Sequence, residues 1–204
     1  MNKMNKKLMG AFTAIIIIAV IIIGGYAVMT KQAQKKAQQE VLPSTEVGKI
    51  LAKDLETKYP ETPTEVVKMY WRISCCMYND DSIADDDFEK MLKKIRVLYD
   101  DEFLKAEENS FDNMLKKFKS DKKKRQDEGQ NIGSYVVQKN DTVEIKTVDK
   151  EEYATVVSSA LIKAKGKTQK TYEKFMCRKS KDGRWKILGW QQINKEAAEE
   201  AGVE

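Results

Sequence analysis

The hydrophobic pattern is most pronounced near the N-terminus, where residues 8–30 are all uncharged and residues 15–23 are almost purely aliphatic. At about 1.5 Å per residue, a helix over this segment crosses a hydrocarbon core of about 30 Å. A cleaved secretory signal is the alternative, but the apolar run is longer than a typical signal core and lacks a good small-x-small cleavage site. The pattern therefore predicts an uncleaved transmembrane signal anchor over 8–30.

The segments on either side of the anchor predict its orientation. Three lysines precede the apolar run and three follow it closely, so the charge difference across the run does not determine the orientation. Long downstream domains translocate with little regard to charge, whereas a short tail is typically retained in the cytoplasm. We therefore expect 1–7 as a cytoplasmic stub, 31–44 as a helical stalk or linker, and an extracytoplasmic domain over 45–194.

Helical periodicity covers the first half of that domain. Apolar residues recur at helical spacing from Val47 to about Tyr59, and Thr62-Pro63-Thr64-Glu65 has the pattern of a capping box that opens a helix to about Asn79. A further helix is expected to be capped by Asp86 with Glu89 and to end near Tyr99. Another is expected to begin near Ser110.

Short β-rich runs follow residue 133, and they predict an antiparallel sheet. The strands are expected over 135–138, 143–148, 152–164, 168–179 and 184–194. In the last strand, a period of two places Trp185, Ile187 and Ile193 on one face and Leu188 and Trp190 on the other. Residues 195–204 are expected to form a short, mobile tail.

Composition excludes several kinds of chemistry. The chain contains no histidine, which removes Ser-His-Asp and Cys-His catalysis and histidine-ligated zinc. Residues 31–204 carry a charge close to neutral, so a dedicated nucleic-acid-binding domain is not expected. The acidic run over 80–87 lacks the spacing of a calcium loop, and capping of the following helix explains it better. We therefore expect no cofactor and no metal.

A lysine-rich run follows Phe118. Such a run usually forms a solvated helix face, and contact with an anionic surface is the more specific alternative. The candidate residues for that contact are Lys116, Lys119, Lys122, Lys123 and Lys124.

The three cysteines offer no obvious reactive site. Cys75 and Cys76 are adjacent on a predicted helix, and Cys177 lies on a predicted strand. Free thiols that behave as small apolar side chains are the simplest interpretation. The alternative is a disulfide between Cys177 and either Cys75 or Cys76.

The order of elements resembles a known family. The "P-x-E-V-V-x-x-Y" pattern over 63–70, two more helices, and strands that close on "D-G-R-W-K-I" over 182–187 are similar to the nuclear transport factor 2-like, or cystatin-like, domains. With its anchor, the chain resembles uncharacterised single-pass membrane proteins of Gram-positive anaerobic bacteria. The resemblance implies an α+β cone, with three to four helices on a curved antiparallel sheet of four to five strands, and a pocket at its open end.

That superfamily includes ketosteroid isomerase and membrane-tethered subunits of secretion systems. The resemblance makes Tyr70, Tyr153, Tyr172 and Trp185 candidate pocket residues, although packing in the core is the commoner role of such tyrosines. No catalytic base can be assigned, so the chain is not expected to be an enzyme.

We expect instead an extracytoplasmic binding or scaffold domain on the bacterial plasma membrane, which contacts an envelope protein around Leu188 and Trp190. The alternative is a domain that binds a small apolar ligand in the cone pocket.

Overall fold

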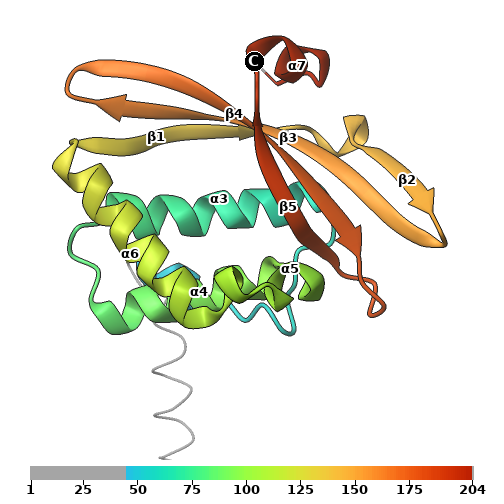
Figure 1. Ribbon diagram of the computed structural model, residues 1–204, viewed down its shortest axis with the longest axis horizontal. Helices are drawn as coiled ribbons and strands as arrows, with labels where there is room; N and C mark the ends of the chain where they lie inside the picture. The colour runs from blue at the N-terminus through green and yellow to red at the C-terminus, as the bar shows by residue number, and fades with distance from the viewer. Residues whose placement is uncertain (1–44, 204) are drawn as a thin grey trace, which may run out of the picture. The chain divides into compact units, whose positions relative to one another are not determined.

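Helices cover one side of an antiparallel five-stranded sheet in the computed structural model, which describes residues 45–203 (Figure 1). The architecture is α+β, as expected. The predicted stub, anchor and stalk at 1–7, 8–30 and 31–44 lie outside the described residues. No helix within residues 45–203 is long and apolar enough to cross a membrane.

The described residues contain six α-helices, more than the three to four expected. Two of them, α5 and α7, are too short to show an apolar stripe in the sequence. The α-helices are α2 (Glu46–Ala52), α3 (Pro63–Asn79), α4 (Asp85–Leu98), α5 (Asp101–Lys105), α6 (Phe111–Asp127) and α7 (Lys195–Glu200). Two 3₁₀ turns, η1 (Glu107–Asn109) and η2 (Asn140–Thr142), complete the helical elements.

The capping signal of α3 is confirmed. The Thr62 side chain accepts a hydrogen bond from the Glu65 backbone N–H, and Pro63 occupies the first turn. The Glu65 carboxylate accepts from the backbone N–H of Glu61 rather than from that of Thr62. The helix therefore begins where the local sequence predicts, with a slightly shifted version of the box.

Two other helix boundaries differ from the prediction. The first helix ends at Ala52, because a turn follows in which Asp54 accepts the backbone N–H groups of Glu56 and Thr57. Helix α4 begins at Asp85 with Ala84 at its N-cap position, so Asp86 does not cap it. The three aspartates of its first turn stabilise the helix dipole instead.

The sheet has the strand order β1-β3-β4-β5, and β2 pairs with the other half of the long strand β3. All described pairings between strands are antiparallel. The strands are β1 (Gln130–Val137), β2 (Glu144–Val148), β3 (Glu151–Ala164), β4 (Lys167–Lys179) and β5 (Trp185–Ile193).

A β-bulge in β5 overturns the predicted facing of its residues. Met176 pairs with Gly189 and Cys177 pairs with Ile187, so Leu188 is an extra residue without a partner on β4. A bulge of this kind shifts the alternation by one residue. Trp190 therefore turns to the helix side, and Ile193 turns to the outer side.

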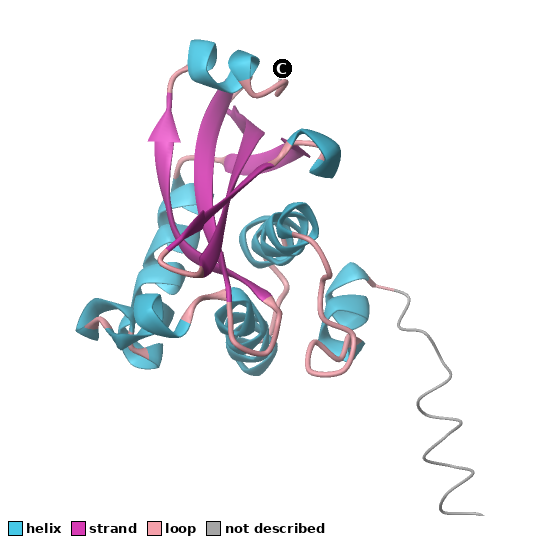
Figure 2. Ribbon diagram, turned by 90° about the vertical axis from the view of Figure 1, so that its right-hand side faces the viewer, coloured by secondary structure: helices cyan, strands magenta, loops and turns pink. Residues whose placement is uncertain are grey.

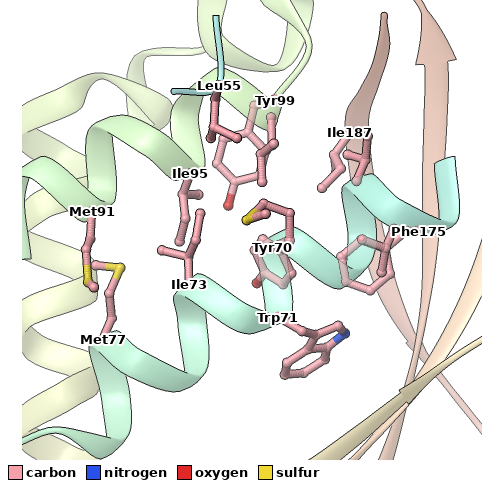
Figure 3. Close-up of a cluster of buried hydrophobic side chains, with 14 of the residues drawn as sticks. Leu55, Tyr70, Trp71, Ile73, Met77, Met91, Ile95, Tyr99, Phe175 and Ile187 are labelled. Atoms are coloured by element: carbon pink, nitrogen blue, oxygen red, sulfur yellow. The ribbon is translucent and has the colours of Figure 1, made fainter. Parts of the chain in front are cut away.

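The main core lies between the sheet and helices α2, α3, α4 and α6. Figure 3 shows Tyr70 of α3 at its centre, between Tyr99 and Phe175. The ring centroids are 6.4 Å apart for Tyr70 and Tyr99 and 5.3 Å apart for Tyr70 and Phe175. Helix α3 thus connects the helical layer to β4 through aromatic contacts.

The segment expected as a mobile tail is ordered up to residue 203, and that prediction is corrected. Helix α7 is capped by the Asn194 side chain and lies on the outer side of the sheet, opposite the other helices (Figures 1 and 2). Ala198 and Val203 are fully buried there against Val157 and Tyr172. Apolar contacts, which are few and widely spaced in this sequence, hold the segment in place.

Candidate functional site

Leu188 and Trp190, the predicted interface residues, lie next to the same groove on the outer face of the sheet. The groove has a volume of about 300 Å³. It is lined by Thr155, Lys174, Phe175, Met176, Leu188, Gly189, Trp190 and Gln191. The bulge points the Trp190 ring into the helix layer, where it remains 38% exposed.

A glycine forms the open part of this groove. A Cβ atom added to Gly189 would meet no atom within 4 Å, so the backbone here faces open space. Beside it, Met176 is 48% exposed although it is a large apolar side chain. Lys174 and Gln191, both exposed, stand at the rim. The result is a small apolar depression with a polar border, the composition found at the centre of protein interfaces.

The four predicted pocket residues do not come together. Tyr70 and Trp185 are buried in the main core, and Trp185 is 5% exposed. Tyr172 lies beneath α7 on the opposite side of the sheet. Tyr153 is at the surface, where its hydroxyl donates a hydrogen bond to Glu151. These residues therefore line no common pocket.

A group of buried polar atoms on the helix side was missed in the sequence. Ser74 Oγ, Tyr99 Oη and Glu173 Oε2 are all buried, and none meets the distance and angle of a hydrogen bond within residues 45–203, although Ser74 lies close enough to the Tyr70 hydroxyl to lower the pKa of Tyr70. Ser74 lies one helical turn after Tyr70 on α3. Glu173 precedes Phe175 by two residues on β4, so its side chain is on the same face as that ring. Ser74 and Tyr99 therefore lie close to Tyr70, and Glu173 is on the face of β4 that packs against the helices.

The charge state of this group is unusual. Burial raises the pKa of Glu173 to about 7 from its ordinary 4.5, and the Arg125 guanidinium offsets only part of that rise. Burial also raises the pKa of Tyr70, Tyr78 and Tyr99, and the Glu173 carboxylate adds to the effect on each of them. Glu173 is thus a buried carboxyl group that titrates near neutral pH beside three tyrosines.

The sequence did contain a signal for Glu173. Phe175 and Cys177 are both fully buried on the helix side, and period two places Glu173 on that same face. A carboxylate at a buried position of an amphipathic strand is uncommon unless it is paired. The nearby lysines at 170 and 174 weaken this signal, because they give the stretch the composition of an exposed strand.

The lysine-rich run on α6 divides into two groups. Lys119 forms an ion pair with Asp85, and Lys122 donates to the Asp80 carbonyl while its ammonium lies over the Phe88 ring. Lys116, Lys123 and Lys124 are exposed. The first group helps to hold α6 to its neighbours, and only the second faces solvent.

A larger groove, about 760 Å³, lies where α5 meets the hairpins β2–β3 and β4–β5. Its centre is Arg178, which donates to both carboxylate oxygens of Asp100. Asp100 also caps α5, and its backbone N–H donates to the Ile187 carbonyl. Five basic and five acidic residues line the groove, so its net charge is zero and it does not favour ligands of either charge sign.

The thiols have no activated environment. The three cysteines are free, and Cys177 is fully buried. Burial raises the pKa of Cys75 and that of Cys177 to about 12 each. Both therefore remain protonated at neutral pH and are poor nucleophiles.

Comparison with known sequences places the chain in one family. No curated protein matches the sequence. Residues 1–190 match a family described as "Domain of unknown function (DUF6715)". The match spans the segment before Thr45 as well as the helices and nearly all of the sheet, and it stops short of α7. Because it covers most of the chain, this protein belongs to the DUF6715 family.

Proposed function

We propose that this protein is a non-enzymatic binding module, tethered to the outer face of a bacterial plasma membrane by residues 8–30, that docks an envelope protein on the outer side of its sheet. The observation that carries the proposal is the groove at Gly189, bordered by Met176 and Leu188. Apolar depressions with a polar rim are typical of docking points for a partner's side chain. Tethering raises the local concentration of partners in the same membrane.

The chemistry of the chain supports binding rather than catalysis. Without histidine, a hydroxyl or thiol nucleophile lacks its usual general base, and the pKa values of Cys75 and Cys177 are raised by burial. The order of packed helices followed by an antiparallel sheet also supports assignment to the nuclear transport factor 2-like domains. A small apolar ligand is less well supported, because Tyr70 and Trp185 occupy the core.

Substitution of Gly189 tests the proposal. The full-length protein, tagged and expressed in its native membrane, is cross-linked and purified with its partners. Gly189→Arg fills the groove with a charged side chain without a clash at Cβ, so we expect it to abolish recovery of the partner. Gly189→Ala adds only a methyl group and should retain recovery.

Thr168→Arg is the matched control, because Thr168 is exposed on β4 and lies outside the groove. It adds the same charge and should recover the partner at the wild-type level. If Gly189→Arg recovers the same proteins in the same amounts as Thr168→Arg, the groove is not the docking site.

A further inference from the structure

A pocket of about 480 Å³ lies where the loop between α2 and α3 and the first half of α3 meet β1. Its volume is within the range of small-ligand sites, about 300 to 1,000 Å³. The charged residues that line it are Lys53, Lys58, Lys68 and Arg72, with Glu61 and Glu65, which leaves an excess of two positive charges. We call it the basic pocket. It shares no residue with the outer groove at Gly189.

The three lysines of the basic pocket have no acidic partner in the fold. Within residues 45–203, no ion pair engages the ammonium group of Lys53, Lys58 or Lys68. The two glutamates do not neutralise them, because the Glu65 carboxylate accepts a hydrogen bond from the backbone N–H of Glu61. The positive charge of the pocket is therefore available to an anion from outside the domain.

Only part of the Arg72 guanidinium is used by the fold. Its Nε atom pairs with Glu46 at 2.5 Å, while in the described part of the chain no hydrogen bond or ion pair engages Nη1 or Nη2. Lys68 precedes Arg72 by four residues on α3, so the two side chains are neighbours on the helix surface. Like charges at this spacing repel each other, and an anion between them would remove that cost.

Tyr135 adds a neutral hydrogen-bond donor from β1. Burial raises the pKa of its hydroxyl, so the group keeps its proton at neutral pH and can donate. The ring stacks on that of Trp71, with 6.0 Å between the centroids. Trp71 is itself held by a hydrogen bond of 2.9 Å from Nε1 to Ser158 Oγ. The wall of the basic pocket that carries this hydroxyl is therefore fixed by the core.

We propose that the basic pocket binds a phosphate group, either that of an anionic phospholipid head group or free phosphate. Phosphate oxygens accept hydrogen bonds from ammonium, guanidinium and hydroxyl groups, and a guanidinium can bind two of them at once. Residues 31–44, which link Thr45 to the proposed anchor, span at most about 50 Å, so head groups lie within reach of the domain. The lipid source rests on the proposed membrane anchor, and the free-phosphate source does not.

The test follows the fluorine NMR resonance of Trp71 in the full chain, labelled with 5-fluorotryptophan and placed in lipid nanodiscs at neutral pH. Trp71 is the reporter because its ring stacks on Tyr135 of the pocket wall. In the first arm, inorganic phosphate is titrated into phosphatidylcholine nanodiscs, with sodium chloride at the same ionic strength as the control. We expect a saturable shift with a Kd of about 1 mM or tighter for phosphate, and no such shift for chloride.

The second arm distinguishes the two sources of phosphate. It uses nanodiscs rich in phosphatidylglycerol, an anionic phospholipid, with no phosphate added. A shifted Trp71 resonance in these nanodiscs identifies the lipid head group as the ligand. An unshifted resonance there, together with saturable binding in the first arm, identifies free phosphate.

Variants assign the binding to the pocket. Lys58→Gln combined with Lys68→Gln removes two unpaired charges and should weaken the binding of phosphate at least about tenfold. Tyr135→Phe keeps the ring and removes the hydroxyl, and it should weaken binding about threefold. Glu61→Gln removes a repulsive charge and should strengthen it. The control Lys167→Gln changes an exposed lysine of β4 outside the pocket and should leave the Kd unchanged.

Two results would overturn the proposal. The first is a Trp71 resonance that neither phosphate nor phosphatidylglycerol shifts more than sodium chloride does. The second is a folded variant with both Lys58→Gln and Lys68→Gln that binds as tightly as the wild type. Near-ultraviolet circular dichroism establishes that each variant is folded. Neither result depends on the outer groove at Gly189, so docking of a protein there can fail or succeed independently.

Discussion

Replacing Glu173 by glutamine should change how the stability of the protein depends on pH. In the folded state, burial raises the pKa of Glu173 to about 7, whereas in the unfolded chain it returns to its ordinary 4.5. Between these two values the folded state binds a proton that the unfolded state has released. The free energy of unfolding therefore falls as the pH rises through this interval, and it levels off above about pH 7.

The size of the effect follows from the two pKa values. Each pH unit across the interval is worth about 1.4 kcal/mol, so the rise from 4.5 to about 7 amounts to roughly 3 kcal/mol. Between pH 5 and pH 8 the wild type should lose about 2 to 3 kcal/mol of unfolding free energy. The chain contains no histidine, so no other side chain with an ordinary pKa titrates in this window.

The assay is urea unfolding of the full chain in non-ionic detergent at several pH values. Tryptophan fluorescence reports on the domain alone, because all three tryptophans lie within residues 45–203. Glu173→Gln should abolish the slope and should be more stable than the wild type at pH 8. The control Glu196→Gln, which changes an exposed carboxylate on α7, should keep the slope. A wild-type slope in Glu173→Gln would refute the reasoning.

Three further predictions concern the fold. Asp100→Asn removes the buried carboxylate of the Arg178 ion pair and should cost about 3 kcal/mol of unfolding free energy, whereas Glu102→Gln, which removes an exposed partner of the same arginine, should cost less than about 1 kcal/mol. Urea unfolding compares the two, and equal costs would contradict the assignment. Thr62→Ala removes the cap of α3, and the same measurement should show a loss of about 1 kcal/mol. Val203→Asp should release α7 and make that segment sensitive to protease, while retained protection would show that Val203 does not hold it.

Local sequence signals predicted the fold best where one short motif determines an element. The predicted N-cap at Thr62 places the start of α3 correctly, and the helix expected from near Ser110 begins at Phe111, with the Ser110 side chain as its cap. The strands β2 to β5 were also located closely. The bulge at Leu188 could not be predicted from the sequence, because it depends on how two strands pair and not on either strand alone.

The candidate sites depend on tertiary placement even more strongly. Simple alternation along β5 predicts that Leu188 and Trp190 lie on the same face of the sheet. The extra residue of the bulge turns the Trp190 ring to the opposite face. Tyr70 and Tyr172 were grouped by residue type, yet they lie on opposite sides of the sheet. Glu173 lies two residues before the buried Phe175 on β4, so it faces the helices although charged residues flank it in the sequence. Whether each of these side chains is buried or exposed depends on the tertiary fold, which local sequence patterns do not determine.

Site-specific photocross-linking in intact cells tests the central claim most directly, because it asks what touches the outer groove while the protein remains in its membrane. A photoreactive amino acid replaces Leu188 at the groove or, as the control, the exposed Thr168 outside it. We predict one dominant cross-linked envelope protein from position 188, which is lost when Gly189→Arg is added, and no such product from position 168. The same products from both positions, or products from position 188 that persist with Gly189→Arg, would contradict the account.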